Sequence, residues 1–524
     1  MHNRAKVIRL TKNSAKDKKT NRRPKEVLIM RDNVFNRQLR SKIAQPAEAS
    51  LLIQNGMTVA MGGVTASGYP KLIPAELIKR KMAGEDLQIN LISGSSVGPE
   101  IDEAMSTTDI IRWRAPLTDS RMLAKRANMG QVSYVEQQMH KMPFIIQNNI
   151  FGEIDVAVIE ALCITEEGYI IPTASVGTVP QFLSAAKSII IEVNTAQPPE
   201  LQNMHDIYLP GLPPTRKPIP LSQTAQKIGE PFMRVDPDKI KFIIESDHPD
   251  TTVPAKGSNS DTGRITDNLL NFLELEIPRT MAGKLPPIQT GFGNLARDIV
   301  ESFRNSNFNN LEFFCGVLQE ANIELIAAGK VSAASTSAVQ ITPRVKKLLH
   351  KLPELFKDTL ILRNSDVINC AEVISRLGVV TLNSAIEVDI YGNVNSSHIT
   401  GSYVVNGLGG GANFAQNAGL SVIIIPSATK GGGISTIVPM VSHCDISEHD
   451  IDVIITDQGV ADLRGKDDIA RARCIIENCA AEDYRDKLGD YLDRSIKAVG
   501  GHHPHILSEV FSWHSKLQET GSMK

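Results

Sequence analysis

Short apolar runs alternate with amphipathic segments along most of the chain. The pattern predicts a helix over residues 36–56 that ends at Gly56, and a strand over 57–63 that ends in two glycines. A second helix is expected over 70–84 and a second strand over 87–96. Alternation of this kind predicts a parallel α/β architecture. Further apolar runs that predict buried strands lie at 155–162, 188–194, 379–392, 420–428 and 452–459.

The length of the chain requires more than one domain. A chain of 524 residues is too long for a single hydrophobic core. The most polar and proline-rich region, from about 198 to 267, predicts the connection between domains. We expect an N-terminal domain over 30–235 and a C-terminal domain over 236–524.

The two halves share a local plan. Residues 155–170 and 379–394 each contain an apolar strand, an acidic residue and a glycine turn that leads back into apolar residues. Internal duplication of one α/β unit would explain this plan. Chance similarity between two parallel-sheet domains is the alternative.

Charge and cysteine content exclude several classes of protein. The 56 basic and 58 acidic residues leave a net charge of −2, which does not favour binding to nucleic acid or to a membrane surface. No apolar run reaches the roughly 18 residues that a membrane span needs. The six cysteines form no close C-x-x-C pair, which is typical of a reduced intracellular protein.

Residues 1–29 differ in composition from the rest of the chain. They are rich in Lys, Arg and Asn, and this predicts a disordered, solvated tail of a cytoplasmic protein. A mitochondrial presequence is the alternative interpretation. Met30 opens the first well-patterned segment and is an alternative translation start to Met1.

Three glycine-rich loops are candidates for ligand binding. They lie at 289–298, 406–420 and 428–436, and the second has four glycines before a helix-like segment. Glycines let backbone N–H groups approach a ligand closely, and two such loops can converge into an oxyanion hole. A tight loop without a ligand is the alternative.

Two acidic features near the C-terminal strands are also candidates. Residues 441–452 gather histidines and carboxylates, but they lack the H-x-x-x-H spacing of a helix-borne metal site, so a hydrogen-bonded turn is preferred. Asp457 ends a predicted strand. Such a carboxylate either faces a pocket or belongs to an ordinary turn.

Several stretches together resemble the acetyl-CoA hydrolase/transferase family. This family is the branch of class I CoA-transferases that includes succinyl-CoA:acetate and propionyl-CoA:succinate CoA-transferases. The resemblance extends from about Arg31 to about Arg473. The stretches that carry it are 94–102, 154–177, 205–220, 291–296, 385–418 and 438–465.

The resemblance implies a fold and a reaction. It implies two related CoA-transferase-type α/β domains with the active site at their interface, and a homodimer. It implies coenzyme A as a substrate, a small carboxylate as its partner, and neither a metal nor a permanently bound cofactor. In the family a glutamate attacks the acyl-CoA thioester, and a glutamyl-CoA thioester then passes CoA to an incoming carboxylate.

The family glutamate has no counterpart in this chain. It lies in a segment resembling Tyr-Thr-Glu-Val-Leu-Gln-Asp, which matches Val317, Leu318 and Gln319. The glutamate therefore falls on Gly316, which we expect at the junction of a strand and a helix. Glu320 and Glu312 lie four residues away on either side, and neither is expected to reach the site.

Most of the surrounding site is expected to be present. The resemblance implies that the backbones of Gly410 and Phe292 form the oxyanion hole, that Asn369 matches an asparagine of the site, and that Asp457 replaces a glutamate. Departures occur in the first half, where Glu136 stands for an aspartate and Gln138 for a histidine. The stretch 112–120 also lacks the aromatic residue that usually follows the proline. The remaining glycines of the expected CoA-binding loop are Gly407, Gly409 and Gly411.

Three functional hypotheses follow. The first is a CoA-transferase-family protein that acts on acyl-CoAs of the acetyl, propionyl and succinyl class, with altered chemistry. The second is a catalytically silent CoA-binding protein or a partner of an active paralogue. The third is a slow thioesterase, in which a water fills the space beside Gly316 and another group, such as Asp457, acts as its base.

Overall fold

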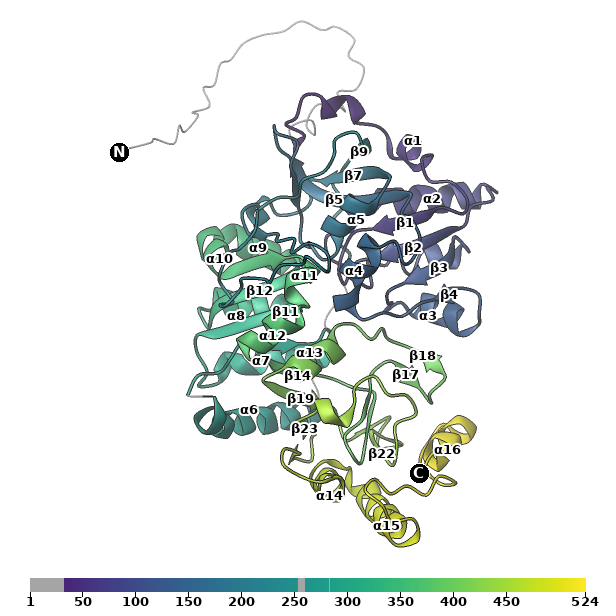
Figure 1. The fold of residues 1–524 in the computed structure, drawn as a ribbon, viewed down its shortest axis with the longest axis vertical. Coiled ribbons are helices and arrows are strands. Elements are labelled where there is room, and N and C mark those ends of the chain that lie inside the picture. Colours follow the sequence, from purple (N-terminus) through teal and green to yellow (C-terminus); the bar gives the residue numbers. More distant parts are fainter. Residues whose placement is uncertain (1–32, 253–259, 282) are drawn as a thin grey trace, which may run out of the picture.

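A computed structural model describes residues 33–252, 260–281 and 283–524 (Figure 1). The basic tail predicted over 1–29 and both candidate start methionines lie outside the described residues. Two parallel sheets organise the described chain. Short helices cover them, and a helical C-terminal segment completes the fold.

The first sheet has eight strands in the order β4-β3-β2-β1-β5-β7-β9, and β6 pairs antiparallel with β5. The strands that were expected over 57–63, 87–96, 155–162 and 188–194 all belong to it. Its strands are β1 (Thr58–Met61), β2 (Ile89–Ser93), β3 (Ile111–Ala115), β4 (Ser133–Tyr134), β5 (Val156–Ile164), β6 (Ile170–Pro172), β7 (Ser188–Asn194) and β9 (Ile240–Ser246). Its helices are α1 (Pro46–Ser50), α2 (Leu72–Met82), α3 (Arg121–Asn128), α4 (Met142–Gln147) and α5 (Val179–Ala185).

The helix predicted over 36–56 is wrong in its length. The α-helical part, α1, begins at Pro46. A residue before proline is disfavoured in helical conformation, and Gln45 is extended with ψ 146°. Ile43 instead forms a parallel bridge with Ile243 beside β9. The helix predicted over 70–84 is confirmed by α2.

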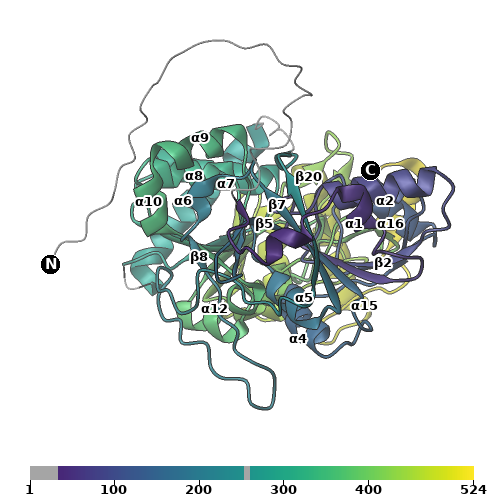
Figure 2. The ribbon, with the colours of Figure 1, turned by 90° about the horizontal axis from the view of Figure 1, so that it is seen from above.

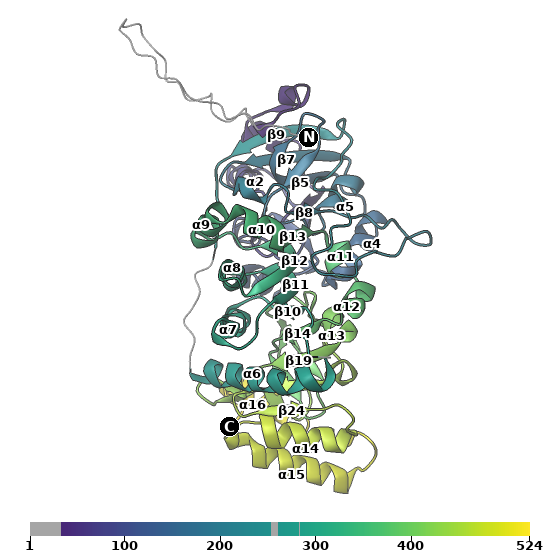
Figure 3. The ribbon, with the colours of Figure 1, turned by 90° about the vertical axis from the view of Figure 1, so that its left-hand side faces the viewer.

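The second sheet has nine strands in the order β24-β23-β19-β14-β10-β11-β12-β13-β8. Figure 3 shows α7 and α8 on one side of it and α11, α12 and α13 on the other. Its strands are β8 (His205–Asp206), β10 (Ile288–Thr290), β11 (Leu311–Leu318), β12 (Val331–Val339), β13 (Leu360–Arg363), β14 (Val380–Asn383), β19 (Leu420–Ile424), β23 (Val453–Ile455) and β24 (Val460–Asp462).

Helices and small sheets surround the second sheet. Seen from above, α8, α9 and α10 lie on the opposite side of the molecule from α1 and α2 (Figure 2). The helices are α6 (Ser260–Thr280), α7 (Asn294–Ser302), α8 (Glu320–Ala327), α9 (Pro343–Lys351), α10 (Pro353–Thr359), α11 (Ser365–Ile368), α12 (Ala371–Leu377), α13 (Gly411–Asn417), α14 (Asp468–Cys479), α15 (Glu482–Ala498) and α16 (Ser512–Thr520). The small sheets contain β15 (Glu387–Asp389), β16 (Val394–Asn395) and β22 (Ile437–Val438), with the pairs β17 (His398–Ile399) and β18 (Tyr403–Val404), and β20 (Ala428–Thr429) and β21 (Ile434–Ser435).

The chain crosses between the sheets before it leaves the first one. Strand β8 pairs with β13 at the edge of the second sheet, and the chain then returns to form β9 beside β7. The expected domain boundary at 235/236 therefore precedes a strand of the first sheet. By sheet membership, the first unit extends to Ser246.

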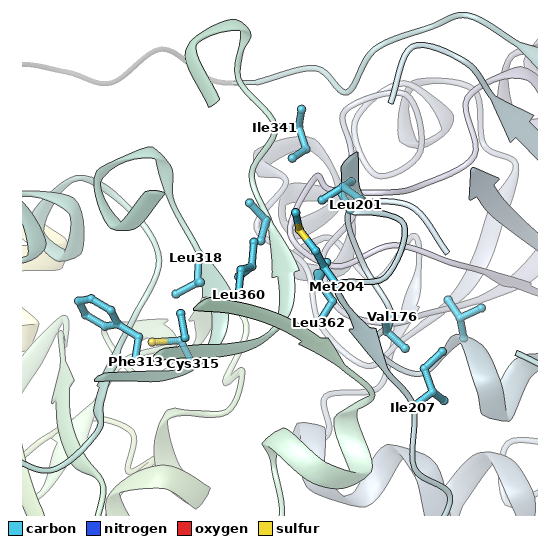
Figure 4. Packing of buried hydrophobic residues seen from close by; sticks show 14 of the residues in the cluster. Val176, Leu201, Met204, Ile207, Phe313, Cys315, Leu318, Ile341, Leu360 and Leu362 are labelled. Carbon is cyan, nitrogen blue, oxygen red and sulfur yellow. The ribbon is translucent and has the colours of Figure 1, made fainter. Parts of the chain in front are cut away.

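One hydrophobic cluster joins the two units. Met204 and Ile207 flank β8 and pack with Leu360 and Leu362 of β13, and Val176 of the first unit lies in the same cluster (Figure 4). Backbone hydrogen bonds between the segment after β6 and strand β12 add to this contact. No described helix combines the length and the apolar character that crossing a bilayer requires.

Candidate active site

A cavity of about 420 Å³ lies where the carboxyl ends of the two parallel sheets meet. Val64, Ser95 and Asp119 enter it from the segments that follow β1, β2 and β3. Phe292 enters it from the loop after β10, and Gly316 enters it from β11 of the second sheet. In the second sheet the strand order reverses between β10 and β14. Open parallel sheets bind ligands outside the carboxyl ends of their strands at such a reversal.

Gly316 lines this cavity from within β11. The strand continues to Leu318, so Gly316 precedes the junction with α8 by two residues, and the expectation of a junction residue is wrong. Its carbonyl oxygen accepts a hydrogen bond from Thr336 Oγ1 at 3.3 Å. A Cβ atom added to Gly316 would meet no atom within 4 Å. The space that a side chain at position 316 would occupy is therefore open in the cavity wall.

The two neighbouring glutamates point elsewhere, as expected. Glu312 forms an ion pair with Lys284 at 2.8 Å near the start of β11. Glu320 opens α8 and accepts a hydrogen bond from the hydroxyl of Thr342. Neither glutamate is among the described residues that line the cavity.

The glycine loop 406–411 forms the opposite wall. All four of its glycines line the cavity, together with Asn369. At Gly407 a Cβ would lie 2.4 Å from Leu117 Cβ, so this close approach of the two units requires glycine. At Gly410 a Cβ would lie 3.0 Å from Asn369 Oδ1. The structure thus brings Gly316, Phe292, Asn369 and the glycine loop together.

Side chains of the first unit hold this loop in place. The backbone N–H of Leu408 donates to Glu136 Oε1 at 2.6 Å, and the N–H of Met139 donates to Gly409 O at 3.4 Å. Asn128 of α3 pairs its side-chain amide with both backbone groups of Val404 in β18, at 2.9 and 3.0 Å. Figure 1 shows β17 and β18 beside α3. Glu136 therefore contacts the glycine loop directly, and sequence reasoning noted it only as a departure from the family.

The other glycine-rich segments behave differently from each other. In the loop after β10, Gly293 N–H donates to Gln319 Oε1 at 3.2 Å, while no hydrogen bond among the described residues engages the N–H of Phe292 or of Gly410. The segment 428–436 lies away from the cavity, where Tyr484 donates a hydrogen bond to Gly432 O at 3.1 Å. Only two of the three predicted glycine loops converge in the part of the chain that the structure describes.

Asp457 is outside the cavity. It follows β23, which lies four strands from β11, a separation of roughly 19 Å at the usual strand spacing. Ser427 donates to its carboxylate through its backbone N–H at 2.6 Å and its hydroxyl at 3.0 Å. Burial acts to raise the pKa of Asp457, but these hydrogen bonds and one from Gln458 outweigh it and lower the pKa. The carboxylate has the contacts of an ordinary turn aspartate.

Asp119 is a cavity residue that sequence reasoning missed. Its carboxylate is exposed to the cavity and accepts a hydrogen bond from the backbone N–H of Gly407. Its position deep in the protein, together with the charge of Asp102, raises the pKa to about 6, although Gly407 and Arg114 act in the opposite direction. The available signal was its place after a strand, in a stretch that departs from the family.

The histidine and carboxylate segment 441–452 forms hydrogen-bonded turns. His443 Nε2 lies 3.1 Å from Asp445 Oδ1, and the hydroxyl of Ser397 donates to the same carboxylate at 2.7 Å. Across the described ranges, no three His, Cys, Asp or Glu side chains form a group that could hold a metal ion.

Comparison with known proteins identifies the family. The chain matches the acetyl-CoA hydrolase/transferase N-terminal domain over residues 28–253 and the C-terminal domain over 346–492. It is 39% identical over 501 residues to the succinyl-CoA:acetate CoA-transferase of Clostridium kluyveri, covering 95% of this chain and 93% of that protein. It is 38% identical over 519 residues to the acetyl-CoA hydrolase of Candida glabrata, with coverage of 95% and 98%.

A solved structure shows the same fold. RipA from Yersinia pestis superimposes with a TM-score of 0.69 at 18% identity, covering 88% of this chain and 99% of that chain. The overall α/β fold is thus shared with a known protein. From the extent and identity of the matches, this chain belongs to the acetyl-CoA hydrolase/transferase family.

Proposed function

We propose that the cavity binds the thioester end of a small acyl-CoA of the acetyl, propionyl or succinyl class. The N–H groups of Gly410 and Phe292 would donate to the thioester oxygen, as an oxyanion hole requires. Both residues line the cavity, and neither N–H is engaged by the described residues. Asn369 would support the glycine loop beside Gly410, where its Oδ1 would lie 3.0 Å from a Cβ atom added to that glycine.

The open space at Gly316 is the observation that decides the chemistry. A covalent CoA-transfer route needs a carboxylate within bonding reach of the thioester carbon, and glycine has none. Loss of a catalytic nucleophile costs about 10⁶ in rate in the best-documented hydrolase. Under this proposal the protein binds acyl-CoA but does not transfer CoA through an enzyme-bound thioester.

One pair of experiments tests this proposal. Isothermal titration calorimetry with acetyl-CoA should show binding. CoA exchange between succinyl-CoA and acetate should be undetectable in the native protein and should appear in Gly316→Glu. In Gly316→Gln the new side chain has almost the same shape as glutamate but is not a nucleophile. This variant should bind acetyl-CoA but should not exchange CoA. Exchange by the native protein at ordinary enzymatic rates would overturn the proposal, as would absence of binding.

A second candidate function is hydrolysis of the same thioester by water. The observation that favours it is the carboxyl group of Asp119 in the cavity wall. Hydrolysis needs neither an acceptor acid nor a glutamyl intermediate. Release of free thiol from acetyl-CoA in the absence of acetate, followed with a thiol reagent, would distinguish it from silent binding.

The assembly is a proposal that rests on the family resemblance alone, and the location is a proposal that rests on the composition of the chain. We expect a homodimer, which light scattering coupled to size-exclusion chromatography would test. We expect the protein in the cytoplasm unless residues 1–29 act as a presequence, which fluorescent tagging of chains begun at Met1 and at Met30 would decide. If the protein is silent alone, an active paralogue would be its partner.

A further inference from the structure

Asp119 has the position that a general base in this cavity needs. It is the one ionisable side chain among the described residues that line the cavity. It follows β3 of the first unit, whereas Gly316 and Phe292 enter from the second unit. A molecule bound between the two units would therefore contact this carboxylate from the first unit and Gly316 and Phe292 from the second.

The Asp119 carboxylate also has free capacity to accept a proton. An ionised carboxylate offers about four lone-pair sites. Within the described residues, the backbone N–H of Gly407 is the one hydrogen-bond donor to it. The backbone N–H of Asp119 donates to Ser96 Oγ at 3.0 Å, which fixes the segment without engaging the carboxylate.

Charged and titratable groups lie behind the carboxylate. Asp102 and Arg114 form a buried ion pair of 3.0 Å, and Asp102 accepts a hydrogen bond from the Ser96 hydroxyl. Glu136 engages the next N–H of the glycine loop. Two further groups on the surrounding elements are Tyr134, which accepts from Thr118 N–H, and Glu103, which accepts from Ser120 Oγ. Arg121 opens α3 two residues after Asp119.

We propose that Asp119 is the general base for hydrolysis of the acyl-CoA thioester by a water molecule held in the space beside Gly316. This inference rests on the proposed binding of acyl-CoA. Asp119 takes a proton from water as the water oxygen bonds to the acyl carbon. The carbon–sulfur bond then breaks, and the CoA thiolate takes the proton back from Asp119. The products are the free acid and CoA thiol, and no other reactant is needed.

The role of Asp119 as a general base predicts how hydrolysis depends on pH. A base must be deprotonated to act, so kcat should rise with pH through about 6, the pKa of Asp119. Asp119→Asn keeps an oxygen that can accept from Gly407 N–H but cannot take a proton. Its kcat should fall by about 10² to 10⁴, and the rise near pH 6 should vanish. Asp119→Glu should keep a rise with pH.

Binding measurements separate this inference from the proposed function. Acetyl-CoA affinity of Asp119→Asn should stay within a few-fold of native. Asp358→Asn, on the exposed side of α10, is the matched control for loss of a carboxylate. No binding by the native protein would overturn the proposed function. Binding without thiol release, or equal hydrolysis by native protein and Asp119→Asn, would overturn the role of Asp119 alone.

Isotope labelling distinguishes a base from a nucleophile. In a single turnover of acetyl-CoA in ¹⁸O-water, a general base leads to one ¹⁸O atom in the released acetate. If Asp119 attacked the carbonyl carbon instead, the CoA thiolate would leave and an acyl–aspartyl anhydride would form. Attack of water on the aspartyl carbonyl of that anhydride would place the ¹⁸O in the Asp119 carboxylate, detected by mass spectrometry, and would leave the acetate unlabelled. That second result would overturn the proposal.

Discussion

At the scale of single residues, Gly316 has no side chain in the cavity, and yet the strand around it is intact. The strand around it is complete, with Cys315 paired opposite Thr336 and Val317 opposite Ala338 in β12. The missing side chain leaves no contact broken, because a Cβ there would touch nothing. The absence of a side chain at Gly316 therefore leaves the sheet intact.

The same observation predicts the effect of Gly316→Ala on stability. Glycine within a strand costs roughly 0.5–1 kcal/mol relative to alanine, and the added methyl group fits without strain. The free energy of unfolding, measured with urea, should rise by about this amount without any gain of CoA exchange. Gly63→Ala is the matched opposite case, because Gly63 has φ 112° and its Cβ would lie 2.5 Å from Tyr69 Cβ. It should destabilise the protein, and a similar loss in Gly316→Ala would contradict the open space.

At the scale of elements, the glycine loop depends on the first unit for its shape. Two successive N–H groups of loop 406–411 donate hydrogen bonds to carboxylates of the first unit. The N–H of Gly407 donates to Asp119, and the N–H of Leu408 donates to Glu136. Gly407 allows Leu117 of the first unit to pack closely against the loop. Tight packing of this kind fixes the backbone donors in place before a ligand arrives.

Removal of the Glu136 carboxylate should loosen the loop. In Glu136→Ala the N–H of Leu408 loses a charge-assisted hydrogen bond, and such bonds contribute about 1.5–3 kcal/mol. Amide hydrogen exchange over 405–411 should accelerate by at least about tenfold, since tenfold corresponds to about 1.4 kcal/mol. Glu136→Gln keeps an acceptor and should lie between native and Glu136→Ala. Unchanged exchange in Glu136→Ala would show that the contact does not hold the loop.

Particular residues show how far the sequence predicts this structure. The apolar runs 155–162, 188–194 and 420–428 were confirmed as strands because sheets covered on both faces favour continuous apolar segments. Strand β8 was not foreseen, because a two-residue strand carries no periodicity and its partner β13 lies far along the chain. Proline at position 46 shortened a helix that the apolar pattern alone extends.

The candidate site was predictable only where a motif carried it. Gly316, Gly410, Phe292 and Asn369 follow from family stretches, and the structure gathers them in one cavity. Asp119 could not be foreseen, because its exposure to the cavity depends on how the end of β3 meets the glycine loop. Asp457 was a candidate because it ends a predicted strand. The sequence does not show which strands flank the reversal of strand order, so it could not show that Asp457 lies away from the cavity.

At the scale of the whole molecule, a buried histidine lies where the two units meet. His205 on β8 is 1% exposed, and its Nε2 lies 2.9 Å from Thr173 O of the first unit, so this nitrogen carries the proton. Burial lowers the pKa of His205 to about 4, although the hydrogen bond to Thr173 acts in the opposite direction. The contact between the units therefore contains a histidine that stays neutral in the folded protein.

Acid should weaken this contact. Between pH 6.5 and 4 the unfolded chain binds a proton at His205 and the folded protein does not, so stability falls as pH falls, by up to about 3 kcal/mol for this group. His205→Gln keeps a donor for Thr173 but does not titrate. Its thermal midpoint should fall less than that of the native protein between pH 6.5 and 4.5. His248→Gln, at an exposed histidine, should follow the native curve, and equal slopes for all three proteins would contradict the prediction.

The vacant side-chain position in the cavity wall has an evolutionary consequence. A single codon change there would exchange one reactivity for another, and the polypeptide would stay well folded at each step. If Gly316→Glu gains CoA exchange, covalent catalysis can be gained and lost between descendants of one gene without compensating changes elsewhere.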